Sequence, residues 1–205
     1  MMLVKVCGIK YQDNLDALAA LDFDMIGLNF YQPSKRYLSA NLDYATLSND
    51  IKKVGVFVNE DIDKVLQLVD LHGLDYAQLH GDESVAYCKA LQEKIKVIKV
   101  FRVKENIDYN LLKSYRFVDM FLLDTYTDQY GGSGKRFDWR LLKNYTLDIP
   151  FLLSGGVSTE DAEDLLSLGI PQCIGVDINS KFETAPGLKD ITLIKTFIKS
   201  IKKIA

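Results

Sequence analysis

Short apolar runs rich in β-branched residues alternate with longer amphipathic stretches along the whole chain. Eight of these runs are typical of strands, and they cover residues 3–7, 25–30, 53–58, 74–80, 96–101, 118–124, 150–155 and 172–178. Most are apolar on both faces, as expected for parallel strands covered by helices. Between them lie stretches with helical spacing. The last of these stretches follows a Pro-Gly break. Its apolar residues recur mostly at steps of three or four: Leu188, Ile191, Ile194, Phe197, Ile198 and Ile201.

Eight strand-and-helix units with right-handed crossovers predict a (β/α)₈ TIM barrel, formed as a single domain over residues 1–205. The main alternative is an open, doubly wound sheet, which commonly carries a GxGxxG fingerprint after its first strand. The segment CGIKYQDNLDAL that follows the first predicted strand has one glycine and no such fingerprint. A dinucleotide site therefore has no support.

Composition narrows the class of protein further. Of 205 residues, 48% are hydrophobic and 26% are charged, and the net charge is −3, which is typical of a globular protein without the positive excess that nucleic-acid binding needs. Apolar runs stay well short of the ~20 residues that span a membrane. The first residues, MMLVKVCGIK, lack a signal-peptide pattern, so we expect a cytoplasmic protein.

Cysteine and histidine usage argues against a metal site. The three cysteines, Cys7, Cys88 and Cys173, form no CxxC pair, which predicts free thiols in a reducing compartment. Only two histidines, His72 and His80, are present, so a histidine-rich metal site cannot be assembled. Cys88 has helical spacing and Cys173 comes early in its strand, so both are expected to be core residues.

The first predicted strand brings a thiol to the carboxyl end of the barrel, where barrel active sites lie. Strand periodicity places Lys5 and Cys7 on one face, toward the interior, and Val4 and Val6 on the other, toward the helices. Cysteines within strands are often inert core residues. Cys7 ends its strand just before a glycine, a position where a thiol can face a ligand.

Polar residues end three further strands. Asp124 closes the sixth and Asp177 the eighth, while Gln78 and His80 share a face of the fourth. An aspartate at a strand end can simply cap the following turn. Two aspartates opposite a cysteine at one barrel mouth are better explained as a general acid and base that need no metal.

Two loops predict a phosphate site. Gly155 and Gly156 lead from the seventh strand into a helix for which Ser158 and Asp161 form a capping pattern, leaving backbone N–H groups free for an anion. Ser180 precedes a short helical turn after the eighth strand. Loops after strands seven and eight commonly hold phosphate in this fold.

Two other segments are candidates for contact with a ligand. The segment GGSGKRFDW, residues 131–139, includes Gly134 and has the composition of a mobile lid, although a merely flexible loop would look the same. Arg36 follows the second strand. Its planar fork suits a carboxylate or phosphate if it faces the barrel mouth, and otherwise it is a solvated charge.

Taken in order, VKVCGIK, GLNFYQPSKRYLS, QLHGDE, FLLDTYTDQYGGSGKRFDW, FLLSGGVSTEDA, GVDINSKFET and APGLKD resemble the motifs of the phosphoribosylanthranilate isomerase family of tryptophan biosynthesis. The resemblance covers essentially the whole chain. It implies an Amadori rearrangement of N-(5-phosphoribosyl)anthranilate to 1-(o-carboxyphenylamino)-1-deoxyribulose 5-phosphate, an aldose-to-ketose isomerisation without a cofactor, by a monomer or homodimer.

The resemblance also implies residue roles. Asp124 matches the general acid, Cys7 the general base and Arg36 the arginine that holds the anthranilate carboxylate. Further substrate-binding or supporting residues are Gly155, Gly156 and Ser180 at the phosphate, Asp177 near the amino and sugar groups, and Lys5, Gln78, His80 and Gly134. Lys181 stands where the family more often has glycine, and we expect its side chain to point to solvent.

Two other functions stay open at this stage. Another phosphosugar enzyme with the same barrel, such as an epimerase or indole-glycerol-phosphate synthase, would explain the phosphate loops but not the Cys7 and Asp124 pair. A barrel kept only for binding would have little use for an acid and a base at its mouth.

Overall fold

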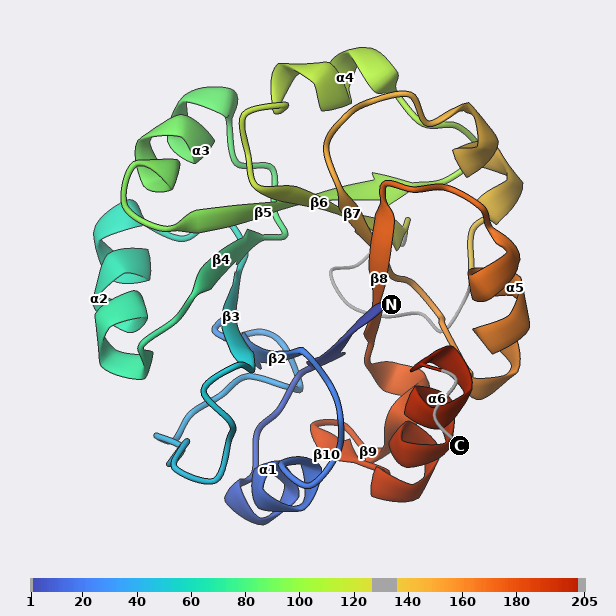
Figure 1. Ribbon diagram of the computed structural model, residues 1–205. Coiled ribbons are helices and arrows are strands. Elements are labelled where there is room, and N and C mark those ends of the chain that lie inside the picture. The colour runs from blue at the N-terminus through green and yellow to red at the C-terminus, as the bar shows by residue number, and fades with distance from the viewer. Residues whose placement is uncertain (1, 127–135, 203–205) are drawn as a thin grey trace.

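The computed structural model describes residues 2–126 and 136–202, and eight parallel strands form a closed barrel within them (Figure 1). The strands are β1 (Leu3–Cys7), β2 (Met25–Asn29), β3 (Lys52–Phe57), β4 (Tyr76–Leu79), β5 (Lys96–Val103), β6 (Met120–Thr125), β7 (Phe151–Leu153) and β8 (Cys173–Ile178). Each pairs with the next, and β8 pairs with β1. All eight predicted strands are present, with ends shifted by no more than two residues. The predicted TIM barrel is confirmed.

Helices cover the outside of the ring (Figure 1). The α-helices are α1 (Gln12–Leu18), α2 (Ile62–His72), α3 (Val85–Gln92), α4 (Tyr109–Ser114), α5 (Ala162–Ser167) and α6 (Ile191–Lys202), and the 3-10 helices are η1 (Trp139–Asn144), η2 (Thr159–Asp161) and η3 (Ser180–Phe182). No helix among the described residues is long and apolar enough to cross a membrane.

The connection between β2 and β3, residues 30–51, differs from the expected helical stretch, because it contains no helix. Its side chains bind the backbone locally instead: Asp43 accepts from the N–H of Ala45 at 2.9 Å, and Ser34 accepts from the N–H of Arg36 at 3.1 Å. Such local bonds compete with helical hydrogen bonds. The long irregular loop is what carries Arg36 over the barrel mouth.

A second difference lies before the last helix. Leu188 was expected to belong to the helical stripe, but it lies in β10 (Leu188–Lys189), which pairs antiparallel with β9 (Glu183–Ala185), and its side chain is exposed. Gly187, at φ 84°, forms the turn between these two strands. The helix begins only at Ile191, so the small hairpin is a feature that helical periodicity concealed.

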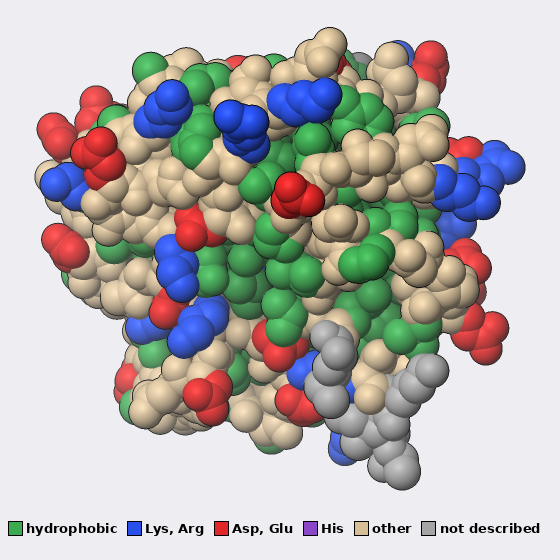
Figure 2. Space-filling view, turned by 45° about the horizontal axis from the view of Figure 1, so that its top comes forward, with side chains coloured by type: hydrophobic (Ala, Val, Ile, Leu, Met, Phe, Trp, Pro, Cys, Tyr) green, Lys and Arg blue, Asp and Glu red, His purple; other side chains and the backbone are tan. Residues whose placement is uncertain are grey.

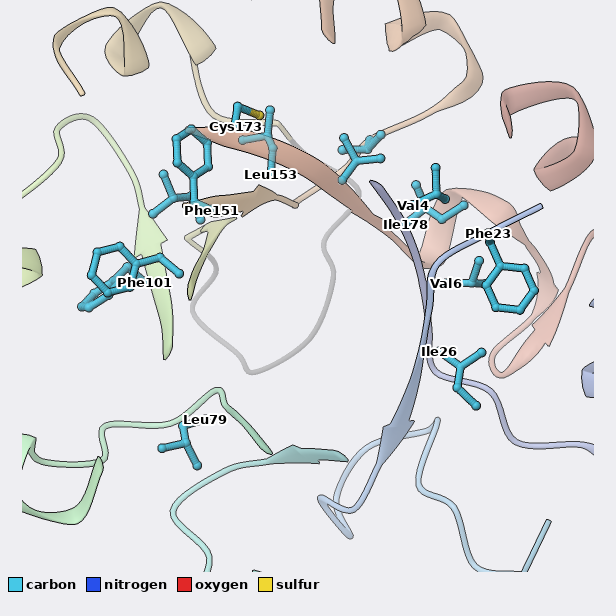
Figure 3. Close-up of a cluster of buried hydrophobic side chains, with 14 of the residues drawn as sticks. Val4, Val6, Phe23, Ile26, Leu79, Phe101, Phe151, Leu153, Cys173 and Ile178 are labelled. Atoms are coloured by element: carbon cyan, nitrogen blue, oxygen red, sulfur yellow. The ribbon is translucent and has the colours of Figure 1, made fainter. Parts of the chain in front are cut away.

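Two apolar layers hold the barrel together. Val4, Val6 and Ile26 point away from the barrel interior into the layer between strands and helices (Figure 3). The interior is filled toward the amino ends of the strands by a smaller cluster: Met25, Val54, Ile98, Val100, Met120, Leu122 and Leu152. Cys88 and Cys173 are buried, as expected for core residues.

On the face shown in Figure 2, acidic and basic side chains are interspersed around an apolar centre.

A buried ion pair outside the barrel mouth fixes the chain after β4. Lys99 Nζ donates to Glu83 Oε2 at 2.7 Å and to the Gly81 carbonyl at 2.8 Å, and both charged side chains are under 5% exposed. Glu83 Oε1 accepts from the N–H of Asn59 at 2.9 Å. Each charge therefore has a partner that compensates for its lost hydration.

We expect Lys99→Met to lower the free energy of unfolding by about 3–5 kcal/mol, because the substitution leaves Glu83 buried without its counter-ion. Lys96→Met on the same strand is the control: Lys96 is exposed, so its loss should cost no more than about 0.5 kcal/mol. Urea unfolding followed by fluorescence measures both values. Equal losses in the two variants would contradict the prediction.

Candidate active site

One pocket at the carboxyl ends of the strands brings together nine of the eleven predicted site residues. These are Cys7, Arg36, Gln78, His80, Asp124, Gly155, Gly156, Asp177 and Ser180. Lys5 lies in the barrel interior with a fully buried side chain, where it bonds Asp177. Gly134 lies outside the described residues. Residues from six strands or the loops that follow them therefore meet at one mouth, as the fold requires of its active sites.

The floor of the pocket is an ion pair between neighbouring strands. Lys5 and Asp177 are paired in register on β1 and β8, and Lys5 Nζ donates to Asp177 Oδ1 at 2.8 Å. The Ser154 hydroxyl lies 3.3 Å from Asp177 Oδ2. Burial lowers the pKa of Lys5, but the charge of Asp177 outweighs it and the pKa lies above its usual value. Lys5 is therefore a fixed cation beneath Cys7.

Cys7 ends β1 with a side chain that is 5% exposed and lines the pocket. Burial and the nearby Asp177 carboxylate raise the pKa of the thiol, while the positive charges of Lys5 and Lys189 oppose this shift. The two lysines thus supply the counter-charge that a thiolate would need in a dry site.

Asp124, another residue of the pocket, is held by two groups. Its Oδ1 accepts from the N–H of Thr125 at 2.7 Å, and its Oδ2 lies 3.2 Å from His80 Nε2. The other ring nitrogen of His80 lies 3.2 Å from Gln78 Nε2. An amide nitrogen only donates, so Nδ1 accepts, and His80 carries its proton on Nε2, facing Asp124. Gln78 thus sets the tautomer of His80.

Gln78 also has an unused polar atom in the site. Its side chain is 1% exposed, and its Oε1 has no hydrogen-bond partner among the described residues. A buried acceptor without a donor is costly. The pocket therefore offers an acceptor that a ligand hydroxyl or N–H group would satisfy.

Arg36 reaches the pocket from the loop after β2, but it is not a free charge. Glu183 binds it through a fork: Nε donates to Oε1 at 2.9 Å and Nη2 donates to Oε2 at 2.6 Å. Glu183 also accepts from Lys189 Nζ at 2.7 Å, and Lys189 in turn donates to Asn179 Oδ1 at 2.8 Å. The result is a largely buried network of charged groups beside Cys7.

The two predicted phosphate loops follow the neighbouring strands β7 and β8. Gly155 has φ 84°, and a Cβ there would lie 2.3 Å from Thr125 Oγ1, so only glycine fits this close approach. The N–H groups of Gly156 and Ser180 have no acceptor among the described residues. Such free N–H groups are what an anion binds.

The helix after these glycines is capped as predicted. The N–H and hydroxyl of Ser158 both donate to Asp161 Oδ2, at 2.7 and 3.0 Å. Arg136, which precedes η1, pairs with Asp161. Of the predicted lid, residues 131–135 lie outside the described residues. Lys181 is exposed, which confirms that its side chain points to solvent.

Sequence reasoning missed several polar residues of this region, Asn29, Tyr31 and Ser34 of the pocket lining among them. Ser154 and Asn179 line the pocket, and Glu183 and Lys189 lie behind Arg36. Ser154 and Asn179 directly follow β7 and β8, so their positions at strand ends were a usable signal. Glu183 and Lys189 lie on the two strands of the hairpin, and their pairing depends on a fold that the sequence pattern did not predict.

Comparisons with known proteins agree on one family. Residues 4–200 match the family model described as N-(5'phosphoribosyl)anthranilate (PRA) isomerase. The N-(5'-phosphoribosyl)anthranilate isomerase of Parabacteroides distasonis is 44% identical over 206 residues, which cover 98% of this chain and 93% of the relative.

Solved structures show the same likeness. Phosphoribosyl anthranilate isomerase from Thermotoga maritima is 36% identical, with a TM-score of 0.85 over 100% of both chains. A second structure, of the isomerase in complex with reduced 1-(o-carboxyphenylamino)-1-deoxyribulose 5-phosphate, is 32% identical, with a TM-score of 0.82 over 100% of both chains. With its closed barrel and the pocket described above, the chain belongs to the N-(5'-phosphoribosyl)anthranilate isomerase family.

Proposed function

We propose that this protein converts N-(5'-phosphoribosyl)anthranilate into 1-(o-carboxyphenylamino)-1-deoxyribulose 5-phosphate in tryptophan biosynthesis, by general acid and base catalysis. The observation that carries the proposal is that Cys7 and the Asp124–His80 pair lie in one pocket, together with a partly buried arginine and two loops whose N–H groups have no acceptor among the described residues. A related isomerase was solved with the reduced form of this product, which supports the choice of substrate.

The two ends of the substrate carry different anions, and the pocket has a matching group at each end. The phosphate binds the N–H groups of Gly156 and Ser180, with Gly155 allowing the close approach. The anthranilate carboxylate binds Arg36, whose guanidinium offers two parallel donors. Binding both ends places the sugar ring between the acid and the base.

The first chemical step is ring opening. Asp124, in its acid form, gives a proton to the furanose ring oxygen, the C1–O bond breaks, and the nitrogen lone pair forms an iminium ion at C1. The ring of His80, whose Nε2 lies 3.2 Å from Asp124 Oδ2, holds the carboxyl group in place. Gln78 Nε2 lies 3.2 Å from the other ring nitrogen, Nδ1, and fixes the orientation of the ring beside Asp124.

The second step removes a proton from carbon. The iminium ion acidifies the adjacent C2–H bond, the Cys7 thiolate takes this proton, and the electron pair of the bond forms the C1–C2 double bond of an enolamine. Protonation at C1 and loss of the proton from the C2 hydroxyl then give the ketone. Lys5 and Lys189 stabilise the thiolate by their charge.

The reaction and its base are tested together by the fluorescence decay of freshly generated phosphoribosylanthranilate. Wild-type protein should consume it, and Cys7→Ala should slow turnover by about 10²-fold or more while binding the reduced product analogue within about tenfold of wild type. Asp124→Asn should behave in the same way. Cys88→Ala makes the same change in a core cysteine and should keep its turnover.

The outcomes separate the alternatives. No decay with wild-type protein that still binds phosphosugars would favour another barrel enzyme or a binding protein. Decay that survives Cys7→Ala would contradict only the base assignment.

The pH profile follows from the state of Cys7. Its pKa lies above the usual value, so the free enzyme holds mostly neutral thiol at neutral pH, and the reactive thiolate increases as pH rises. The value of kcat/KM should therefore rise from about pH 6 toward the raised pKa of the thiol. A profile that is flat, or that falls over this range, would contradict Cys7 as the base.

Arg36→Lys tests the carboxylate contact. A lysine keeps the charge but cannot reproduce the planar fork, so KM should rise about tenfold or more while kcat changes less. Steady-state fluorescence assays give both constants. An unchanged KM would show that Arg36 does not bind the substrate carboxylate.

A further inference from the structure

The hairpin formed by β9 and β10 places a fixed carboxylate against the arginine of the pocket. Glu183, at the start of β9, has a side chain that is 4% exposed, and Arg36 is 14% exposed. Glu183 Oε1 accepts from Arg36 Nε at 2.9 Å, from Lys189 Nζ at 2.7 Å and from the N–H of Gly187 at 3.0 Å. Three donors, one from the loop after β2 and two from the hairpin, thus fix this carboxylate in one orientation.

The contact leaves one edge of the guanidinium available. Glu183 occupies the side edge of Arg36, which consists of Nε and Nη2. Nη1 makes no hydrogen bond with a described residue, so the end of the guanidinium, with one N–H from each of Nη1 and Nη2, remains for a ligand. These two N–H groups are parallel and match the two oxygens of a carboxylate.

The arginine stem is fixed as well. Gly8 has φ 80°, and a Cβ at this position would lie 2.8 Å from Arg36 Cδ and 3.0 Å from Asn179 Oδ1. The stem of Arg36 therefore packs directly on the backbone that follows Cys7. With its stem on Gly8 and its side edge on Glu183, the guanidinium has little rotational freedom left.

The negative charge of Glu183 also favours its contact with Arg36. Burial opposes ionisation of Glu183, but the hydrogen bonds from Arg36 and the charge of Lys189 outweigh it, and the pKa of Glu183 lies below its usual value. Glu183 is thus a carboxylate across the working pH range. Lys189 balances its charge from behind, so Arg36 keeps its attraction for a second anion.

We propose that Glu183 is a positioning residue that holds Arg36 by one edge so that its free end selects ligands with a ring carboxylate. Glu183 does not touch the substrate; it acts through Arg36. The inference rests on the proposed function, since it takes the anthranilate carboxylate as the partner of Arg36. It adds a specificity determinant on the hairpin to the residues of the pocket.

The test compares the binding of two ligands to wild-type protein and to Glu183→Gln. The first ligand is the reduced product analogue, 1-(o-carboxyphenylamino)-1-deoxyribulose 5-phosphate in reduced form. The second is the same molecule without its ring carboxylate. Isothermal titration of wild-type protein and Glu183→Gln should show about tenfold weaker binding of the first ligand to the variant and equal binding of the second. Turnover of the variant should show a raised KM with kcat within about threefold.

A matched control separates positioning from general destabilisation. Asp24 precedes β2 at the amino ends of the strands, away from the pocket, where it accepts from the N–H of Val4 at 2.8 Å and pairs with Lys202 at 3.1 Å. Asp24→Asn removes the same charge and should leave both affinities and KM unchanged. Glu183→Asp, which keeps the charge on a shorter stem, should recover part of the lost affinity.

The outcomes distinguish the two proposals. If wild-type protein fails to turn over phosphoribosylanthranilate, or binds both ligands equally, the proposed function or its carboxylate contact fails. If wild-type protein discriminates between the ligands but Glu183→Gln weakens both equally, or neither, the positioning role is wrong. Tighter binding of the carboxylate ligand by Glu183→Gln would also overturn it, because Glu183 would then compete with the ligand for Arg36.

Discussion

The buried ion pair between Lys5 and Asp177 is the constraint on which the site depends. The two residues are register partners on β1 and β8, at the seam where the last strand meets the first. Neither charge can be buried without the other, because the cost of lost hydration is large in a dry interior. A slip of one residue along this seam would turn Lys5 toward the helices. The contact that closes the barrel therefore also forms the floor of the pocket.

Above the floor of the pocket, positive charges outnumber negative charges around Cys7. The described residues that interact with it are three cations, Lys5, Lys189 and Arg36, and one anion, Asp177, while Glu183 balances the last two cations from behind. Three positive and two negative charges leave room for one more anion. A thiolate at Cys7 would complete the balance, whereas burial alone favours the neutral thiol. The state of Cys7 is set by this competition.

The acid and the base in the proposed mechanism have separate surroundings, which allows them opposite protonation states. Asp124 is bound by the His80 ring and the Thr125 N–H group, and within residues 2–126 and 136–202 no lysine binds it. Cys7 lies among cations from its own strand, from the loop after β2 and from the hairpin. Backbone groups rather than side chains serve the phosphate end, so the loops of Gly155 and Ser180 need no charge of their own.

Much of this arrangement follows from the sequence alone. Two-residue periodicity placed Cys7, Gln78 and Asp124 on inward faces, because strand geometry is local, and the order of strands followed from the handedness of crossovers. Local patterns also located the Ser158 cap. They could not reveal the hairpin, since Leu188 continued a helical spacing by coincidence, nor the irregular loop after β2, where several weak local bonds compete with a helix.

Only the tertiary structure decided which charges meet. Glu183 is 147 residues from Arg36, and Lys5 is 172 residues from Asp177. Neither pairing has a local signal, because long-range contacts depend on barrel closure and on how far each loop reaches over the mouth. The sequence determined which residues face the pocket. The fold determined which of them are neighbours, and hence that the arginine of the pocket is held on one edge and free on the other.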